Sequence, residues 1–302
     1  MMKKILFAFL AAVVLPASLS AGEVVRLTRY MGENLTGVSA SFLFQVEFIS
    51  SAESKAIVEL PLEMENYLVF EKNANGVIKV DMNIPRDVQR QLERNSRNYW
   101  NDNKLVLKIY TRTIEYINLT TVAKLSATGH FTGNNVEIKA DAASKMDEIN
   151  LTAQSLKVRL SGAATSKINV QAASVNLRLE GAGKLTMNLT GNESLTMDID
   201  GAGKLDLNLP ENQRIDMDVS GAGNVTLRGQ GGTLLIDASS AAKVYAKDFP
   251  VQHAEVTASS AANVTVHATD YLKISTSSAA KVQYTGNPSE RNISNPNVRE
   301  IN

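Results

Sequence analysis

A short motif of small residues returns about every 20 positions through the second half of the chain. The central Gly or Ser recurs at spacings of 19, 20, 20, 19, 20 and 18 residues, at Gly162, Gly181, Gly201, Gly221, Ser240, Ser260 and Ser278. A period of this length is typical of solenoids and other repeat architectures. One such unit cannot bury its apolar face alone, so stacking on neighbouring units must supply the core.

Apolar and polar residues alternate strictly before each central small residue. The apolar columns lie four residues before it (Val158, Leu177, Met197, Met217, Ile236, Val256 and Ile274) and two residues before it (Leu160, Leu179, Ile199, Val219, Ala238, Ala258 and, as an exception, Thr276). A second alternating run follows the corner, as in Leu205, Leu207 and Leu209. Period-2 alternation predicts strands with one buried face.

The repeat therefore predicts an all-β fold, a single-stranded parallel β-helix with about 20 residues per coil. The general preference of parallel crossover connections favours right-handed winding. Glycine at the corner suits a bend that needs a positive φ. The alanine that always follows, such as Ala202, is expected to point into a narrow interior, where a larger side chain finds no room.

The first 21 residues have the layout of a secretory signal peptide. Lys3 and Lys4 precede the apolar run Ile5–Leu15, Pro16 ends that run, and small residues follow, with cleavage expected near Ser20 or Ala21. The apolar run is too short to span a bilayer, which takes about 20 residues.

The rest of the chain is predicted to be one β-helix followed by a polar segment. The β-helix is predicted to span residues 22–285. Its early coils, over 22–150, are irregular and contain a polar insertion with helical propensity at 85–104, whereas its coils over 151–285 are regular. Residues 286–302 are predicted to form a C-terminal tail or cap.

Composition excludes several classes of function. Lys plus Arg and Asp plus Glu both number 31, so the chain lacks the positive charge that a nucleic-acid binder needs. It contains no cysteine, which excludes disulfides and thiolate metal sites, and only three histidines. No cofactor and no transmembrane segment is expected.

The runs LEGAGKLTMNL from Leu179 and IDGAGKLDLNL from Ile199, with the signal peptide and the irregular first third, carry a family resemblance. Over about residues 37–286 the chain resembles the auto-transporter adhesin head GIN domain family. The resemblance implies an all-β solenoid, a location outside the cytoplasm and an adhesin-like role. It supplies no catalytic residues to carry over.

One outward column contains three consecutive carboxylates, Asp198, Asp218 and Asp237. Stacked about 5 Å apart, they repel each other unless something neutralises them. A weak Ca²⁺ site is one interpretation, and paired catalytic carboxylates of a glycosidase are another. A solvated face balanced by Arg178 and corner lysines is favoured over both, so no metal site and no catalytic residue is predicted.

Two other features are candidate binding sites. Ser240, Ser260 and Ser278 would form a hydroxyl-rich strip for a glycan or peptide, although small residues also simply suit tight corners. Trp100, in the polar insertion, would either stack on a sugar or partner or pack the insertion onto the coil.

The prediction for function is a non-catalytic, exported, adhesin-like β-helix that binds a surface glycan or an envelope protein. Its location would be the periplasm, the outer-membrane surface or the extracellular space. The alternatives are a carbohydrate-active enzyme on a β-helix scaffold and a structural envelope protein. Self-association is also open, because exposed end coils can pair with other copies.

Overall fold

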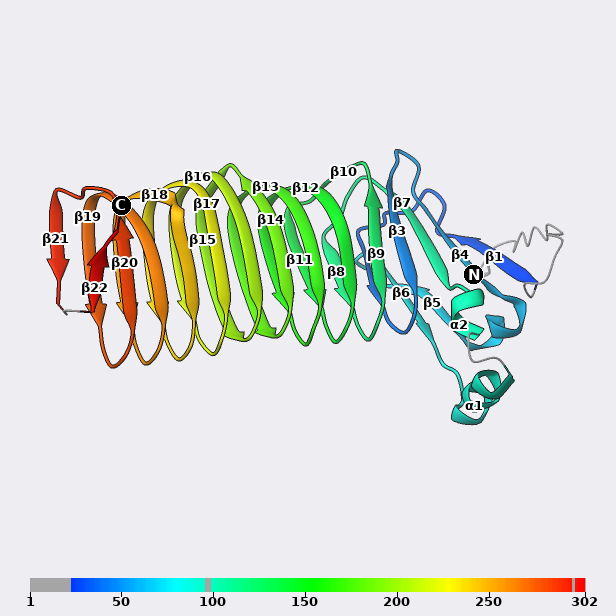
Figure 1. Cartoon of the computed structure of the whole chain (residues 1–302). Helices are drawn as coiled ribbons and strands as arrows, with labels where there is room; N and C mark the ends of the chain where they lie inside the picture. Colours follow the sequence, from blue (N-terminus) through cyan, green and yellow to red (C-terminus); the bar gives the residue numbers. More distant parts are fainter. Residues whose placement is uncertain (1–22, 96–98, 295–296, 302) are drawn as a thin grey trace, which may run out of the picture.

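The computed structural model describes residues 23–95, 99–294 and 297–301. The predicted signal peptide, 1–21, lies outside this part of the chain. The described chain is a parallel β-solenoid of about 9 turns with coils of about 20 residues. Figure 1 shows the coils stacked along one axis, from the amino-terminal strands to β21 at the far end. Right-handed winding stays a prediction.

The elements follow one another in this order. The strands and helices are β1 (Val24–Arg29), β2 (Gly37–Ala40), β3 (Gln45–Ser50), β4 (Lys55–Pro61), the 3-10 helix η1 (Leu62–Tyr67), β5 (Leu68–Lys72), β6 (Val77–Met82), α1 (Arg86–Asn95), α2 (Tyr99–Asp102), β7 (Val106–Thr111), β8 (Tyr116–Leu119), β9 (Lys124–Thr128), β10 (His130–Thr132), β11 (Asn135–Ala140), β12 (Lys145–Leu160), β13 (Thr165–Gly181), β14 (Lys184–Thr190), β15 (Asn192–Gly201), β16 (Lys204–Val219), β17 (Asn224–Ala238), β18 (Lys243–Ala258), β19 (Asn263–Thr276), β20 (Lys281–Thr285), β21 (Glu290–Ile293) and β22 (Val298–Glu300).

The predicted columns lie on top of one another. Leu177 pairs with Met197 and Met197 with Met217, in parallel strands of neighbouring coils. All members of both apolar columns are buried, Thr276 included. The two runs of each repeat join into one long strand in most coils, as in β16, so the GAG or SSA corner is the sharp break in each turn. The parallel, stacked prediction is confirmed.

The corners adopt the left-handed backbone that the glycines suggested. Positive φ occurs at the predicted glycines and also at Ser240, Ser260 and Ser278, with φ of 60°, 59° and 58°. The same conformation extends back to Thr121 and Ala142, where the sequence motif is absent. Each corner is tied to the one before it: the amide of Ala202 donates to the Gly181 carbonyl at 2.8 Å, and that of Ala222 to Gly201 at 2.7 Å.

The expected inward position of the invariant alanine is wrong. Its seven copies are all exposed, and the next residue is the buried one (Ala164, Gly183, Gly203, Gly223, Ala242, Ala262 and Ala280). The left-handed residue turns the chain so that it and the following residue both face water, which shifts the alternation by one position. The narrow interior does exist at that next position, because a Cβ added at Gly203 would lie 2.8 Å from Leu179 Cδ2.

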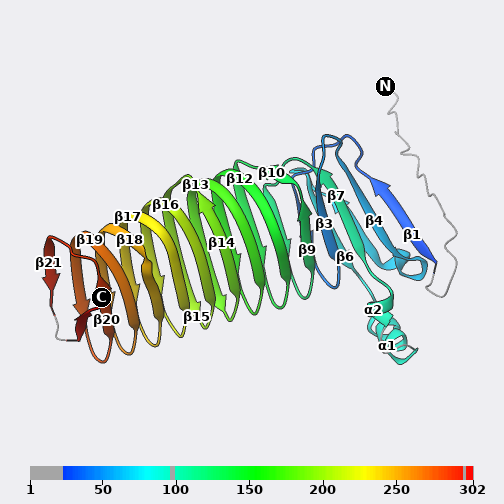
Figure 2. The same ribbon diagram turned by 45° about the horizontal axis from the view of Figure 1, so that its top comes forward.

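The amino-terminal region departs from parallel winding. β1 pairs antiparallel with β4, β4 antiparallel with β7, and β5 and β6 form an antiparallel hairpin. β2 lies between β6 and β8, parallel to both. These strands widen the end of the solenoid in Figure 2, and α1 extends outward beside them.

The polar insertion is helical where it is described, in α1 and α2. At the other end of the chain, β21 pairs in parallel with β19 and β22 with β20, so pairing continues past residue 286. Among the described residues, no helix has both the length and the apolar character needed to cross a membrane.

Candidate functional site

One outward face of the solenoid carries a continuous row of polar side chains along its length, which we call the charged row. Each member is the strand partner of the next, and in spatial order they are Lys79, Ser39, Asn118, Lys139, Arg159, Arg178, Asp198, Asp218, Asp237, Thr257 and Ser275. Neighbouring strands are about 4.8 Å apart, so each side chain lies next to the one above it.

The three predicted carboxylates, Asp198, Asp218 and Asp237, are neighbours in this row and line a shallow groove of about 470 Å³. Partial burial, followed by the charges of Asp237 and Asp198, raises the pKa of Asp218. Arg178 Nη1 lies 3.4 Å from Asp198 Oδ2. In the part of the chain that the structure describes, no group of three or more His, Cys, Asp or Glu side chains could hold a metal ion.

The basic half of the row is paired within the chain. Arg159 and Arg178 both reach Glu180, at 2.9 Å and 2.6 Å. Because both guanidiniums bond this carboxylate, the pKa of Glu180 is lowered. Lys139 Nζ lies 2.9 Å from Glu137 and 5.3 Å from the centroid of the Tyr116 ring.

The predicted serines lie apart from the acidic groove. Ser240, Ser260 and Ser278 are exposed at three successive corners, and none of them lines the groove of the three aspartates. The structure thus brings the serines together and the aspartates together, as two separate strips.

Trp100 is half-buried and packs on the first corner of the solenoid. Its ring meets Phe42 edge-on at 5.0 Å and Tyr99 at 4.9 Å. The Tyr99 hydroxyl donates to Glu63 Oε1 at 2.6 Å, and burial together with this bond raises the pKa of Tyr99. These contacts hold α2 against the coil.

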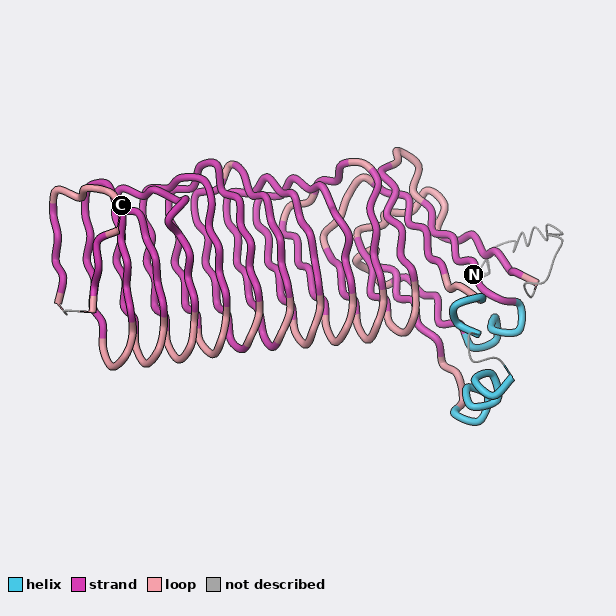
Figure 3. Tube along the Cα trace, in the orientation of Figure 1, coloured by secondary structure: helices cyan, strands magenta, loops and turns pink. Residues whose placement is uncertain are grey.

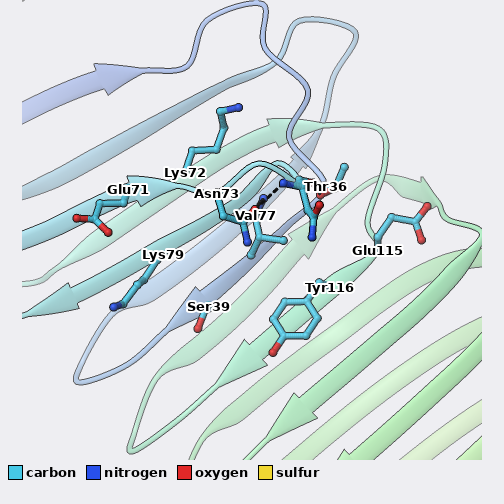
Figure 4. Close-up of a pocket in the computed structure, with 10 residues that line it drawn as sticks. Thr36, Ser39, Glu71, Lys72, Asn73, Val77, Lys79, Glu115 and Tyr116 are labelled. Carbon is cyan, nitrogen blue, oxygen red and sulfur yellow. Dashed lines mark hydrogen bonds between the residues drawn. The ribbon is translucent and has the colours of Figure 1, made fainter.

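A hollow larger than the aspartate groove, which the sequence did not predict, lies at the β5–β6 hairpin (Figure 4). This hairpin hollow has a volume of about 670 Å³ and is lined by Thr36, Ser39, Glu71, Lys72, Asn73, Asn75, Val77, Lys79, Glu115 and Tyr116. The residues come from three distant segments of the chain, and they meet because β2 pairs with both β6 and β8.

The hairpin turn is held in place by local hydrogen bonds. Asn73 Oδ1 accepts from the amides of Asn75 (2.9 Å) and Val77 (3.0 Å), and Thr36 Oγ1 donates to the Asn75 carbonyl (2.6 Å). Gly76, with φ of 82°, approaches Asn34 so closely that an added Cβ would lie 2.6 Å from the Asn34 carbonyl oxygen. The one sequence signal for this feature is Asn75-Gly76 between alternating runs, a hairpin turn signal.

The hairpin hollow contains both charges and an aromatic ring. Glu71 and Lys79 are cross-strand partners. Lys72 Nζ pairs with Glu33 at 2.9 Å, and the Glu115 carboxylate accepts from the amides of Asn134 and Asn135 at 3.0 and 3.1 Å. The half-buried Tyr116 ring lies among these groups (Figure 4), so the hollow offers donors, acceptors and an apolar surface together.

A second polar hollow, of about 730 Å³, lies at the opposite bend of the later coils. It is rich in amides, which include Gln213, Gln230 and Gln252. The His253 ring at its edge lies 5.9 Å from the Tyr271 ring.

Comparison with known proteins agrees with the fold. A crystal structure from Parabacteroides distasonis ATCC 8503, described as a "putative adhesin", matches with 17% identity and a TM-score of 0.52, covering 93% of this chain and 98% of that one. A second "putative adhesin", from Parabacteroides merdae ATCC 43184, is 12% identical with a TM-score of 0.47, covering 93% and 97% of the two chains. No curated protein matches the chain.

The family whose sequence pattern matches is described as "Putative auto-transporter adhesin, head GIN domain", and it matches residues 34–225 and 187–288. These two matches together run from the first parallel coil strand to the last regular coils, and they agree with the resemblance carried by the GAGK corners. The chain belongs to this head GIN domain family.

Proposed function

We propose that the protein is an exported, non-catalytic binding protein of adhesin type, and that its hairpin hollow binds a glycan segment. The observation that carries this proposal is the convergence of the Tyr116 ring with amide, hydroxyl, carboxylate and ammonium groups in one hollow. Family membership and the predicted signal peptide support export and an adhesin role.

The chemistry of a sugar suits this lining. A pyranose presents hydroxyl groups that both donate and accept hydrogen bonds, and it presents apolar C–H faces that pack on aromatic rings. Binding sites for small ligands usually combine an apolar surface with a few placed polar groups. Asn75, Ser39 and Thr36 provide neutral polar groups, and Lys79 and Glu71 can bond hydroxyls or a charged substituent.

A glycan array with the purified chain, followed by calorimetry on any glycan retained, tests the proposal. Tyr116→Ala is expected to weaken binding at least about fivefold, since an aromatic contact contributes about 1 kcal/mol beyond its buried area. Tyr116→Phe keeps the ring and is expected to retain binding. The matched control is Gln213→Ala, which changes the other polar hollow and leaves binding unchanged.

Two results would overturn the proposal. One is binding that survives Tyr116→Ala while Gln213→Ala abolishes it, which would move the site to the opposite bend. The other is release of new reducing ends or unsaturated sugars from a bound glycan, which would replace a binding protein with an enzyme. Retained glycan recovered intact supports the proposal.

A further inference from the structure

The charged row changes sign at its middle. Lys139, Arg159 and Arg178 occupy three successive coils, and the next three coils carry Asp198, Asp218 and Asp237. The charges of the row are therefore antisymmetric about the boundary between β13 and β15. Two side chains that lie the same number of coils from this boundary, on opposite sides of it, carry opposite charges.

The acidic half is not neutralised within the chain. Arg178 reaches Asp198, but within the described residues no cationic group lies within 4.0 Å of the Asp218 or Asp237 carboxylates. The side chains at the centre of the row are about half exposed, at 50% for Arg178 and 51% for Asp198. Partial burial and, after it, the charges of Asp237 and Asp198 raise the pKa of Asp218.

We propose that two copies of this chain pack face to face through the charged row. The two-fold axis lies in the interface, along the strand direction, between the coils of Arg178 and Asp198. This operation reverses the solenoid axis of the second copy and keeps each column opposite itself. Arg178 then faces Asp198 of the second copy, Arg159 faces its Asp218, and Lys139 faces its Asp237.

The adjacent outward column fits the same operation. Lys157 lies two residues before Arg159 on β12, and Asp216 lies two residues before Asp218 on β16. In the proposed dimer, Lys157 therefore faces Asp216 of the second copy. Glu180 and Asp200 form the like-charged facing pair on the other side of the row. The two arginine bonds already made by Glu180 offset that repulsion.

Other arrangements of two copies are less favourable. A two-fold axis parallel to the solenoid axis would place arginine against arginine and aspartate against aspartate. A shift of the proposed axis by one coil, to the boundary between β12 and β13, would place Arg178 against Arg159 of the second copy. Like charges in direct opposition suppress wrong registers, so the row specifies one pairing.

The face is large enough for a stable contact. From Ser39 to Ser275 the row takes nine strand steps of about 4.8 Å, and five residues across the face span about 17 Å. The product is about 700 Å² per copy, close to the roughly 800 Å² per partner of a standard specific interface. Because the contact is electrostatic, its affinity should fall steeply as salt increases.

Sedimentation velocity of the purified chain at 50 and 500 mM NaCl tests the proposal, together with two charge reversals. A dimer at low salt is expected, with a Kd at least tenfold higher at high salt. Arg159→Asp and Asp218→Arg should each be monomeric, whereas an equimolar mixture should dimerise, because each mismatched charge then meets its complement. Lys243→Asp, an exposed corner change off this face, should dimerise like the unmodified chain.

The absence of cysteine from the sequence allows a direct test of geometry. Asn176→Cys and Thr196→Cys lie in one column, on the two coils next to the axis, and a short bismaleimide should link the two variants when they are mixed. Ala222→Cys, at an exposed corner, should remain unlinked.

Monomers at both salt concentrations, or dimers unaffected by Arg159→Asp, would overturn the proposal. So would a chain that stays monomeric and binds Ca²⁺ alone at the three aspartates, because the acidic half would then have a cation as its partner. Far-UV circular dichroism of each variant separates loss of pairing from loss of fold. None of these measurements requires a glycan, although the Ser39 end of the proposed interface borders the hairpin hollow.

Discussion

Gly201 is the position where the stacked corners leave least freedom. Its φ is 113°, well above the values near 60° that Ser240 and its equivalents adopt at their left-handed corners. A Cβ added to Gly201 would lie 2.6 Å from the carbonyl oxygen of Gly181 and 2.9 Å from its nitrogen. Both contacts are with backbone atoms of the preceding coil, so neither can be relieved by a side-chain rotation.

The cost of Gly201→Ala has two parts. Holding an L-residue in a sparsely populated backbone region costs about 1–3 kcal/mol. Relieving the close contact requires the coils to shift, at a cost like that of overpacking a core, about 1–3 kcal/mol. Together they predict a loss of about 4 kcal/mol in the free energy of unfolding.

Gly32→Ala is the matched control. Gly32 also has positive φ, 72°, but an added Cβ would meet no heavy atom within 4 Å. This variant carries the backbone cost alone, about 1–2 kcal/mol. Urea unfolding followed by far-UV circular dichroism should place the midpoint of Gly201→Ala well below that of Gly32→Ala, with similar slopes. Equal midpoints would refute the close-contact part of the argument.

Three further predictions concern the corners, the buried Asn192 and the acidic half of the charged row. Ala202→Leu should change the free energy of unfolding by less than about 0.5 kcal/mol because Ala202 is exposed. Ala242→Leu should lower the free energy of unfolding by about 1–3 kcal/mol because Ala242 is fully buried. Equal urea midpoints for the two variants would contradict the shift in alternation at the corners. Asn192→Ala should lower the free energy of unfolding by about 1–3 kcal/mol, because the side-chain amide of Asn192 donates to three backbone carbonyls at 3.0–3.2 Å. A loss below about 0.5 kcal/mol in the same urea measurement would contradict this prediction. Asp218→Asn should raise the urea midpoint at pH 7 but not at pH 3. The raised pKa means that the folded chain holds the Asp218 proton more tightly than the unfolded chain does, so ionisation of Asp218 destabilises the fold as pH rises. An unchanged urea midpoint at pH 7 would contradict this prediction.

The regular coils could be predicted from the sequence because their signal repeats. Each inward residue, such as Met197 or Met217, has an equivalent about 20 positions away, and period-2 alternation states which residues share a face. The left-handed corners followed from glycine at Gly201. At Ser240 the repeat position identified the corner, whereas residue type alone would not.

The local error at the corners has a physical cause. Alternation assumes extended backbone, and one left-handed residue shifts it by one position; the glycine marks the bend but not this shift. The invariant Ala202 therefore looked inward, although the buried residue is Gly203. The hydrogen bond at this position comes from the backbone, since the Ala202 amide donates to the Gly181 carbonyl.

The hairpin hollow could not be predicted for a different reason. Alternation in β5 and β6 is the same for parallel and antiparallel partners, so the turn signal Asn75-Gly76 alone marks the reversal of the chain there. Tyr116 and Asn75 meet only because β2 inserts between β6 and β8. Such an insertion is a long-range pairing without a local sequence signal.

The charged row shows how this fold separates stability from binding. The inward columns and the corners fix the coil, and the outward residues of the same strands are free to vary without changing it. The ionised Asp218 opposes folding because it is partly buried and lies beside Asp198 and Asp237, and both causes raise its pKa. The aspartates therefore cost stability in the single chain, and the same row carries the complementary charges on the coils of Arg178, Arg159 and Lys139. This arrangement is better explained by what the row contacts than by how the chain folds.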